Sequence, residues 1–144
     1  MLNRPVRECI RRDEPLIGRQ GDKVRAATTQ MAEHACSSIL ICDGERLQGI
    51  FTERDLLVRV VAAGLDPDRV TLGEVMTPDP DTIDGAEPVV EAIRRMDEFS
   101  YRHLPVMENG KVLGVVSLRD LPFDDIAQMQ PELDQRHALA ERMW

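Results

Sequence analysis

The residues best suited to chemistry form one seven-residue pattern that occurs twice. Gly49-Ile-Phe-Thr-Glu-Arg-Asp55 and Gly114-Val-Val-Ser-Leu-Arg-Asp120 each contain a glycine, then a hydroxyl, then an arginine–aspartate pair. A hydroxyl at a helix start, with an acidic residue three positions later, is typical of a cap for the first helical turn. The same groups suit a nucleotide, because helix N–H groups and arginine bind phosphate and a carboxylate accepts bonds from ribose hydroxyls. Both interpretations stay open, although two copies are harder to explain by capping alone.

The doubled pattern is the end of a longer internal repeat. At an offset of 65, residues 15–56 align with residues 80–121 without a gap and share nine identities in 42 positions. Average residue usage gives roughly two or three identities by chance. Conservative pairs such as Thr52/Ser117 lie between the identities. The chain is therefore two copies of one unit.

Each copy predicts the same element order, β-α-β-β-α. Apolar periodicity and the Asp-Gly and Asn-Gly turn signals indicate an extended piece, an amphipathic helix, a hairpin and a closing helix. In the first copy these elements fall at residues 16–18, 24–35, 38–42, 46–51 and 52–63. In the second copy they fall at residues 81–84, 89–96, 103–107, 111–116 and 117–128.

The segments outside the repeat set the expected boundaries. A Gly and a Pro within 62–68 end the first copy, a short helix is expected at 72–76, and Thr77-Pro78-Asp79-Pro80 must be extended. Residues 132–143 contain good helix formers and have no partner in the other copy. We therefore predict an α+β fold, in which 1–68 and 69–128 are the two motifs of one compact module and 129–144 is a helical tail.

The amino-acid composition of the chain argues against several classes of protein. Aromatic residues are only 3% of the 144 residues, so the core must be aliphatic, and the net charge of −8 argues against a general nucleic-acid binder. No apolar run is long enough to span a membrane, and the charged N-terminal stretch lacks a signal-peptide core, so a cytoplasmic protein is expected.

The remaining reactive residues suggest neither a metal site nor an enzyme. His34, His103 and His137 lack the spacing of metal ligands, and Cys36 and Cys42 lie in apolar surroundings that predict buried thiols. The sequence contains no nucleophile–base pair, P-loop or metalloprotease motif. We therefore expect no catalysis and no cofactor.

The doubled pattern resembles the signature of CBS domains. Glu74-Val-Met-Thr-Pro-Asp-Pro80 and His103-Leu-Pro-Val106 are similar to other stretches of the family, and the resemblance covers nearly residues 4–127. It implies a tandem CBS pair, or Bateman module, whose two motifs are related by a pseudo-two-fold axis. Many members bind AMP, ADP, ATP or related adenosyl ligands in two clefts between the motifs.

The resemblance also implies ligand contacts at matching positions of the two copies. The hydroxyl and aspartate would hold ribose, the arginine would bind phosphate, the residues before the hairpin would contact adenine, and the entry strand would close the cleft. For the first site these are Ile17, Gly18, Ser38, Ile39, Leu40, Thr52, Arg54 and Asp55. For the second site they are Thr82, Ile83, His103, Leu104, Pro105, Ser117, Arg119 and Asp120.

Two departures predict that the sites are unequal. Thr82 matches a hydroxyl often found on the entry strand of the family, whereas its partner in the first copy is Ile17. Pro122 follows the second signature, where its missing N–H disfavours a helix interior. The second closing helix is therefore expected to start late, with Asp120 itself as the cap.

The leading hypothesis is a regulatory module that binds an adenine nucleotide and signals to an unidentified protein partner. A homodimer is expected through the helices at 56–63 and 121–128, aided by Arg142-Met143-Trp144. The alternative is a structural or dimerisation module without a physiological nucleotide.

Overall fold

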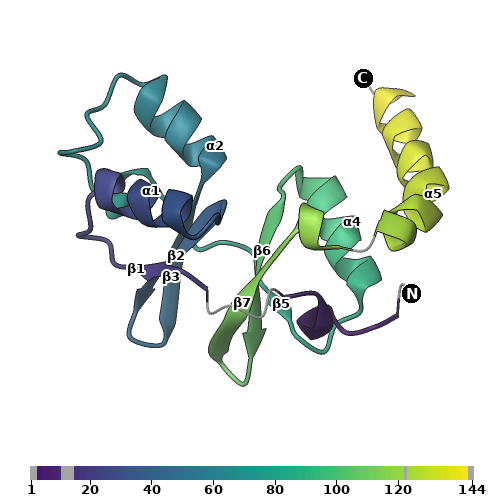
Figure 1. Ribbon diagram of the computed structural model, residues 1–144. Coiled ribbons are helices and arrows are strands. Elements are labelled where there is room, and N and C mark those ends of the chain that lie inside the picture. Colours follow the sequence, from purple (N-terminus) through teal and green to yellow (C-terminus); the bar gives the residue numbers. More distant parts are fainter. Residues whose placement is uncertain (1–2, 11–14, 122, 143–144) are drawn as a thin grey trace. The chain divides into compact units, whose positions relative to one another are not determined.

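The computed structural model describes residues 3–10, 15–121 and 123–142. These residues form two compact units, each with a small sheet and packed helices (Figure 1), which confirms the α+β fold class. The described residues of Asp13–Asp81, with Asn109–Val112, make the first-copy unit. Those of Met1–Arg12, Thr82–Glu108 and Leu113–Trp144 make the second-copy unit. The pseudo-two-fold relation and the clefts that it implies stay predictions.

The first-copy unit has a four-stranded sheet of order β1-β2-β3-β4. β1 is parallel to β2, whereas the pairs β2–β3 and β3–β4 are antiparallel. The strands are β1 (Ile17–Gly18), β2 (Ser38–Asp43), β3 (Arg46–Thr52) and β4 (Thr77–Pro78). The helices are α1 (Val24–Glu33), α2 (Glu53–Asp55), which continues as the π-helix η2 (Leu56–Val61), and α3 (Leu72–Val75).

The second-copy unit has a three-stranded sheet of order β5-β6-β7. Its strands are β5 (Ile83–Asp84), β6 (His103–Glu108) and β7 (Lys111–Ser117). Its helices are the 3₁₀ turn η1 (Val6–Cys9), α4 (Val89–Phe99), the 3₁₀ turn η3 (Leu118–Asp120) and α5 (Phe123–Arg142). The predicted order β-α-β-β-α is confirmed in both copies.

Each unit has its own aliphatic core, as the composition predicts. The buried stripe of the amphipathic helix covers the apolar face of the adjacent hairpin in each case. In the first-copy unit this core includes Val24, Ala27, Met31, Ile39, Ile41 and Phe51. In the second-copy unit it includes Val89, Ala92, Ile93, Met96, Leu104 and Val106.

The two predicted buried thiols differ in exposure. Cys42 is buried, and the loss of solvation raises its pKa, because burial disfavours the thiolate. Cys36 is only half-buried, so that prediction is wrong for this residue. Cys36 lies in the loop before β2, directly after Ala35, whose backbone is left-handed with φ of 51°. The Cys36 side chain is therefore not part of the sheet.

A short segment that precedes each copy packs in the unit of the other copy. The Leu72 N–H donates to the Asp22 oxygen at 2.9 Å, which places α3 in the first-copy unit. The Val6 N–H donates to the Glu87 oxygen at 2.8 Å, which places η1 in the second-copy unit in the same way. The compact units therefore differ from the predicted segments 1–68 and 69–128.

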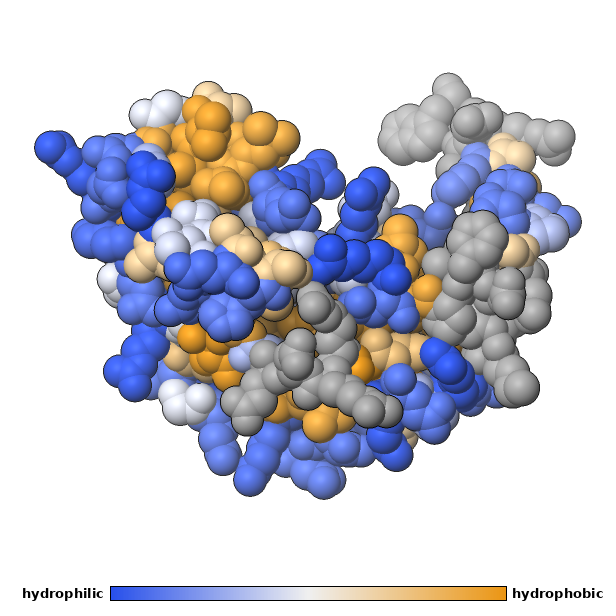
Figure 2. All heavy atoms as spheres, viewed as in Figure 1, coloured by the Kyte–Doolittle hydropathy of each residue, from blue (hydrophilic) through white to orange (hydrophobic). Residues whose placement is uncertain are grey.

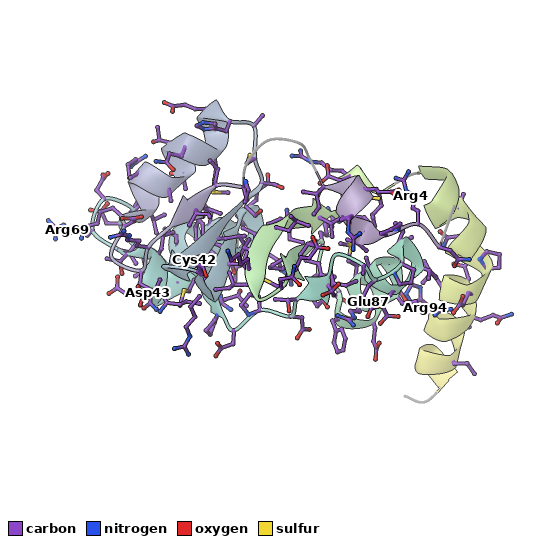
Figure 3. All side chains as sticks on the ribbon, turned by 90° about the horizontal axis from the view of Figure 1, so that it is seen from below. Arg4, Cys42, Asp43, Arg69, Glu87 and Arg94 are labelled. Atoms are coloured by element: carbon purple, nitrogen blue, oxygen red, sulfur yellow. The ribbon has the colours of Figure 1, made fainter. Side chains whose placement is uncertain are left out.

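The C-terminal helix is confirmed, but it begins earlier than 129–144. α5 runs from Phe123 to Arg142 through Pro131, so it joins the last helix of the second motif to the predicted tail. Side chains of α4 hold it: His137 Nε2 lies 2.9 Å from Asp97 Oδ1, and Arg94 makes an ion pair with α5 (Figures 1 and 3). Residues 143–144 of the predicted dimer contact lie outside the described residues.

The described residues contain neither a membrane-spanning helix nor a metal cluster. None of their helices is long and apolar enough to cross a membrane. Within the same residues, His, Cys, Asp and Glu side chains form no group of three or more that could hold a metal ion.

Candidate functional site

The signature glycine of each copy is explained by a close crossing of chain segments. A Cβ added to Gly114 would lie 2.5 Å from Cγ2 of Ile10. A Cβ added to Gly49 would contact Sδ of Met76 and lie 3.0 Å from the backbone oxygen of Thr77. Neither glycine has a positive φ. The glycines are therefore needed for space and not for backbone freedom.

Both signatures are strand-to-helix junctions, as predicted. The Glu53 N–H donates to the Ser37 oxygen at 3.2 Å, and the Leu118 N–H donates to the Arg102 oxygen at 2.9 Å. These two bonds are related by the 65-residue offset. They hold the start of each helical turn against the start of the preceding strand of the hairpin.

The carboxylate of Asp55 caps its own helix and also binds outside it. Oδ2 accepts from the Thr52 N–H at 3.0 Å and from Thr52 Oγ1 at 3.3 Å, while the Asp55 N–H donates back to Thr52 Oγ1 at 3.4 Å. Oδ1 accepts from Thr77 Oγ1 at 3.3 Å and lies 3.6 Å from Nε of Arg59. Asp55 is 8% exposed. The capping interpretation is thus realised in the first copy.

The carboxylate of Asp120 makes the same cap, and within the described part of the chain no contact from outside the signature reaches it. Its Oδ2 accepts from the Ser117 N–H at 3.1 Å and from Ser117 Oγ at 2.7 Å. Ser117 therefore caps the turn η3. That Asp120 caps the later helix stays a prediction, because the start of α5 adjoins a residue outside the described ones. The expected late start is confirmed, since Leu121 is extended (φ −78°, ψ 142°) and α5 begins at Phe123. Pro122 itself lies outside the described residues.

The other predicted residues of the first site lie at one end of the first-copy sheet. The strand register pairs Ile17 with Leu40 and Ser38 with Thr52, and Gly18 pairs with the next residue of β2. Ile39 is 2% exposed within the core, so its side chain is not available to a ligand. Two others are at the surface: Ile17 and Arg54.

The other predicted residues of the second site follow the same plan. Thr82 is half-buried, and its backbone oxygen accepts a 2.7 Å bond from Arg95 of α4. His103 is half-buried at the start of β6, whereas Leu104 is fully buried in the core. Pro105 is buried as well, and Ile83 is in the core, while Arg119 is at the surface.

Two residues that the sequence prediction missed complete the surroundings of Asp55. Arg59 is four positions after Asp55, and this spacing places the two side chains on one helix face, so the sequence contained a signal for it. Thr77 is 22 residues away and carries no local signal. Arg59 also donates to the Met76 oxygen at 2.7 Å and to the Val75 oxygen at 3.4 Å.

Comparison with known proteins finds one family. The profile of the CBS domain matches residues 6–62 and residues 72–121, which together span most of the chain. The matched ranges contain both signatures.

Individual relatives and solved structures agree with this match. The "CBS domain-containing protein CBSCBSPB2" of Arabidopsis thaliana is 33% identical over 94% of the chain, which spans 26% of that protein's length. "Hypoxic response protein 1" of Mycobacterium tuberculosis is 32% identical, over 83% of the chain and 87% of its own length. The solved structure of a CBS domain protein of Pyrobaculum aerophilum complexed with AMP has a TM-score of 0.77 and 26% identity, covering 88% of this chain and 98% of its own.

Proposed function

Since the chain belongs to the CBS domain family, we propose that it is a regulatory module that binds an adenine nucleotide and passes its occupancy to a protein partner. The AMP complex of the Pyrobaculum aerophilum protein supports the ligand class. A nucleotide needs an acceptor for its ribose hydroxyls, and the second signature offers one.

This proposal rests on the carboxylate of Asp120, which has one oxygen that no donor from the described residues binds. A carboxylate has about four acceptor positions on its two oxygens. Ser117 uses two of them, both on Oδ2. Among the described residues Oδ1 of Asp120 has no hydrogen-bond donor, and the residue is half-buried, so Oδ1 is available to a ribose diol. Hydrogen bonds to a charged acceptor contribute about 1.5–3 kcal/mol each.

We also propose that the module forms a homodimer through η2. Leu57, Val58 and Val61 are 62%, 54% and 63% exposed, and Leu65, shortly after the helix, is exposed as well. Figure 2 shows the resulting apolar patch over α2 and η2. Apolar patches of this kind mark interaction surfaces, and a two-fold axis supplies an identical patch. Leu121, by contrast, is buried in the core, so it does not contribute to the patch.

A thermal-shift titration tests the nucleotide proposal. AMP, ADP and ATP are compared with GMP and with ribose 5-phosphate, using the whole chain. At a hundredfold excess over Kd a ligand adds about 2.7 kcal/mol to the native state. Each kcal/mol raises the melting temperature of a chain of this size by roughly 2–4 °C, so an increase of about 5–11 °C is expected.

Asp120→Asn identifies the group that binds. An asparagine oxygen still accepts the Ser117 N–H, so the melting temperature of the free protein should change little. The nucleotide affinity should fall by about 10- to 100-fold, because the charged acceptor is lost. If no adenosine compound shifts the melting temperature at millimolar concentration, the proposal is wrong, and the structural-module alternative replaces it.

A further inference from the structure

Both carboxylate oxygens of Asp55 are bound by groups of its own unit. Three of its four acceptor positions receive Thr52 N–H, Thr52 Oγ1 and Thr77 Oγ1. Arg59 Nε lies 3.6 Å from Oδ1, as an ion pair and not as a hydrogen bond. The side chain is buried, so the donors replace water as its solvation. A ribose diol offers two hydroxyls and would have to displace at least one of these donors, and the displaced donor would lose its charged partner, which carries a free-energy cost.

The same contacts join three segments of the first-copy unit. Thr52 ends β3 and Arg59 lies on η2, while Thr77 belongs to β4. Arg59 strengthens the link, because its Nη1 also donates to the backbone oxygens of Val75 and Met76. Asp55 and Arg59 together therefore hold the segment 75–77 against the helix that follows the signature.

The helix that follows the signature differs in the second copy. Leu121 is extended, as expected for a residue before proline, and this ends the helical turn directly after Asp120. The residue four positions after Asp120, which corresponds to Arg59 in the repeat, is an aspartate, Asp124. The helix that carries Arg59 in the first copy is thus interrupted in the second, and no donor from the described residues binds Oδ1 of Asp120.

We infer that the two signature aspartates have different roles: Asp55 is a structural cross-link between β3, η2 and the segment 75–77, and Asp120 is the ribose acceptor. The second half rests on the proposed function, whereas the first half concerns the ligand-free protein. The chain consequently binds one nucleotide through a signature carboxylate, although its sequence contains the signature twice.

The cross-link is tested in the protein without ligand, by urea unfolding of Thr77→Val. This change removes the hydroxyl that binds Oδ1 and should raise the unfolding equilibrium constant about fivefold or more. Thr29→Val is the matched control, because among the described residues its hydroxyl bonds only to the Arg25 oxygen of its own helix, at 2.9 Å. The control should change the constant less than twofold. Equal effects of the two variants would overturn the cross-link.

The division of roles is tested by isothermal titration calorimetry of AMP with the wild type, Asp55→Asn and Asp120→Asn. We expect one site per chain, an affinity close to the wild type in Asp55→Asn and a loss of 10-fold or more in Asp120→Asn. Should Asp55→Asn fold poorly, Thr77→Val takes its place and should bind AMP with the wild-type affinity. Two sites per chain, or equal losses in the two aspartate variants, contradict the inference. If the wild type binds no adenosine compound, the proposed function fails, while the urea comparison still decides the cross-link.

Discussion

Gly114→Ala tests why the signature glycine is needed. The added Cβ would lie 2.5 Å from Cγ2 of Ile10, well inside the ordinary contact distance, and 3.6 Å from Cδ1. Cγ2 is attached directly to the β-branched carbon, so it cannot move away without a change of χ1 or of the backbone of segment 4–10. Forcing an extra methyl into a packed site costs about 1–3 kcal/mol.

The expected loss is measured by thermal unfolding of the ligand-free chain. A cost of about 1–3 kcal/mol corresponds to a decrease of roughly 2–12 °C in the melting temperature. Gly21→Ala is the control, because a Cβ at Gly21 meets nothing within 4 Å and the residue has no positive φ. It should leave the melting temperature unchanged or raise it slightly. Gly49→Ala should be destabilising as well, because Met76 is flexible and can move aside but the Thr77 backbone oxygen at 3.0 Å is held in the sheet.

A double variant tests whether the contact with Ile10 causes the loss. Ile10→Ala removes the methyl group that the new Cβ would strike. In that background the cost of Gly114→Ala should shrink by about 1 kcal/mol or more, a coupling typical of residues in contact. The reasoning is refuted if Gly114→Ala is as stable as Gly21→Ala, or if its cost does not depend on Ile10.

Two further predictions concern acid stability and assembly. The Thr71 backbone N–H donates to the Glu74 carboxylate at 2.7 Å and holds its pKa below the ordinary value. The stabilisation is therefore present above about pH 4.3 and is lost as pH falls from there through the lower folded pKa. Below about pH 4.3 the melting temperature should fall more steeply in the wild type than in Glu74→Gln, and parallel curves would contradict this. Val61→Glu should convert a dimer to a monomer in light scattering, while Leu139→Glu, at a similarly exposed position (60%), should not; a monomeric wild type would exclude the dimer.

The elements of each copy could be predicted because their causes are local. The hairpin turns depend on residues that accept a positive φ, and Gly44, Asn109 and Gly110 have φ of 60°, 54° and 76°. The amphipathic helices follow from apolar residues spaced by three and four, which form one stripe at 3.6 residues per turn. Such patterns act over one or two turns of chain, so the sequence alone determined the order β-α-β-β-α, the aliphatic core and the two signatures.

The helix that closes the second copy could be predicted only in part from local sequence rules. Its late start follows from Pro122, but the separate turn η3 before it, capped by Ser117, depends on how Asp120 is placed after β7. The length of α5 could not be predicted either, because a proline such as Pro131 usually predicts the end of a helix. α5 nevertheless continues through Pro131, and beyond it His137 contacts Asp97 of α4.

Only the tertiary structure decided what surrounds the two aspartates. The repeat makes Asp55 and Asp120 equivalent, and sequence alone therefore assigned them the same role. Thr77 reaches Asp55 across 22 residues because segment 70–78 folds back onto the first copy, and Ile10 lies over Gly114 because segment 4–10 packs on the second. The donors that reach a carboxylate and the atoms that lie against a glycine are distant in the chain but adjacent in space. The spacing of residue types along the sequence therefore does not predict them.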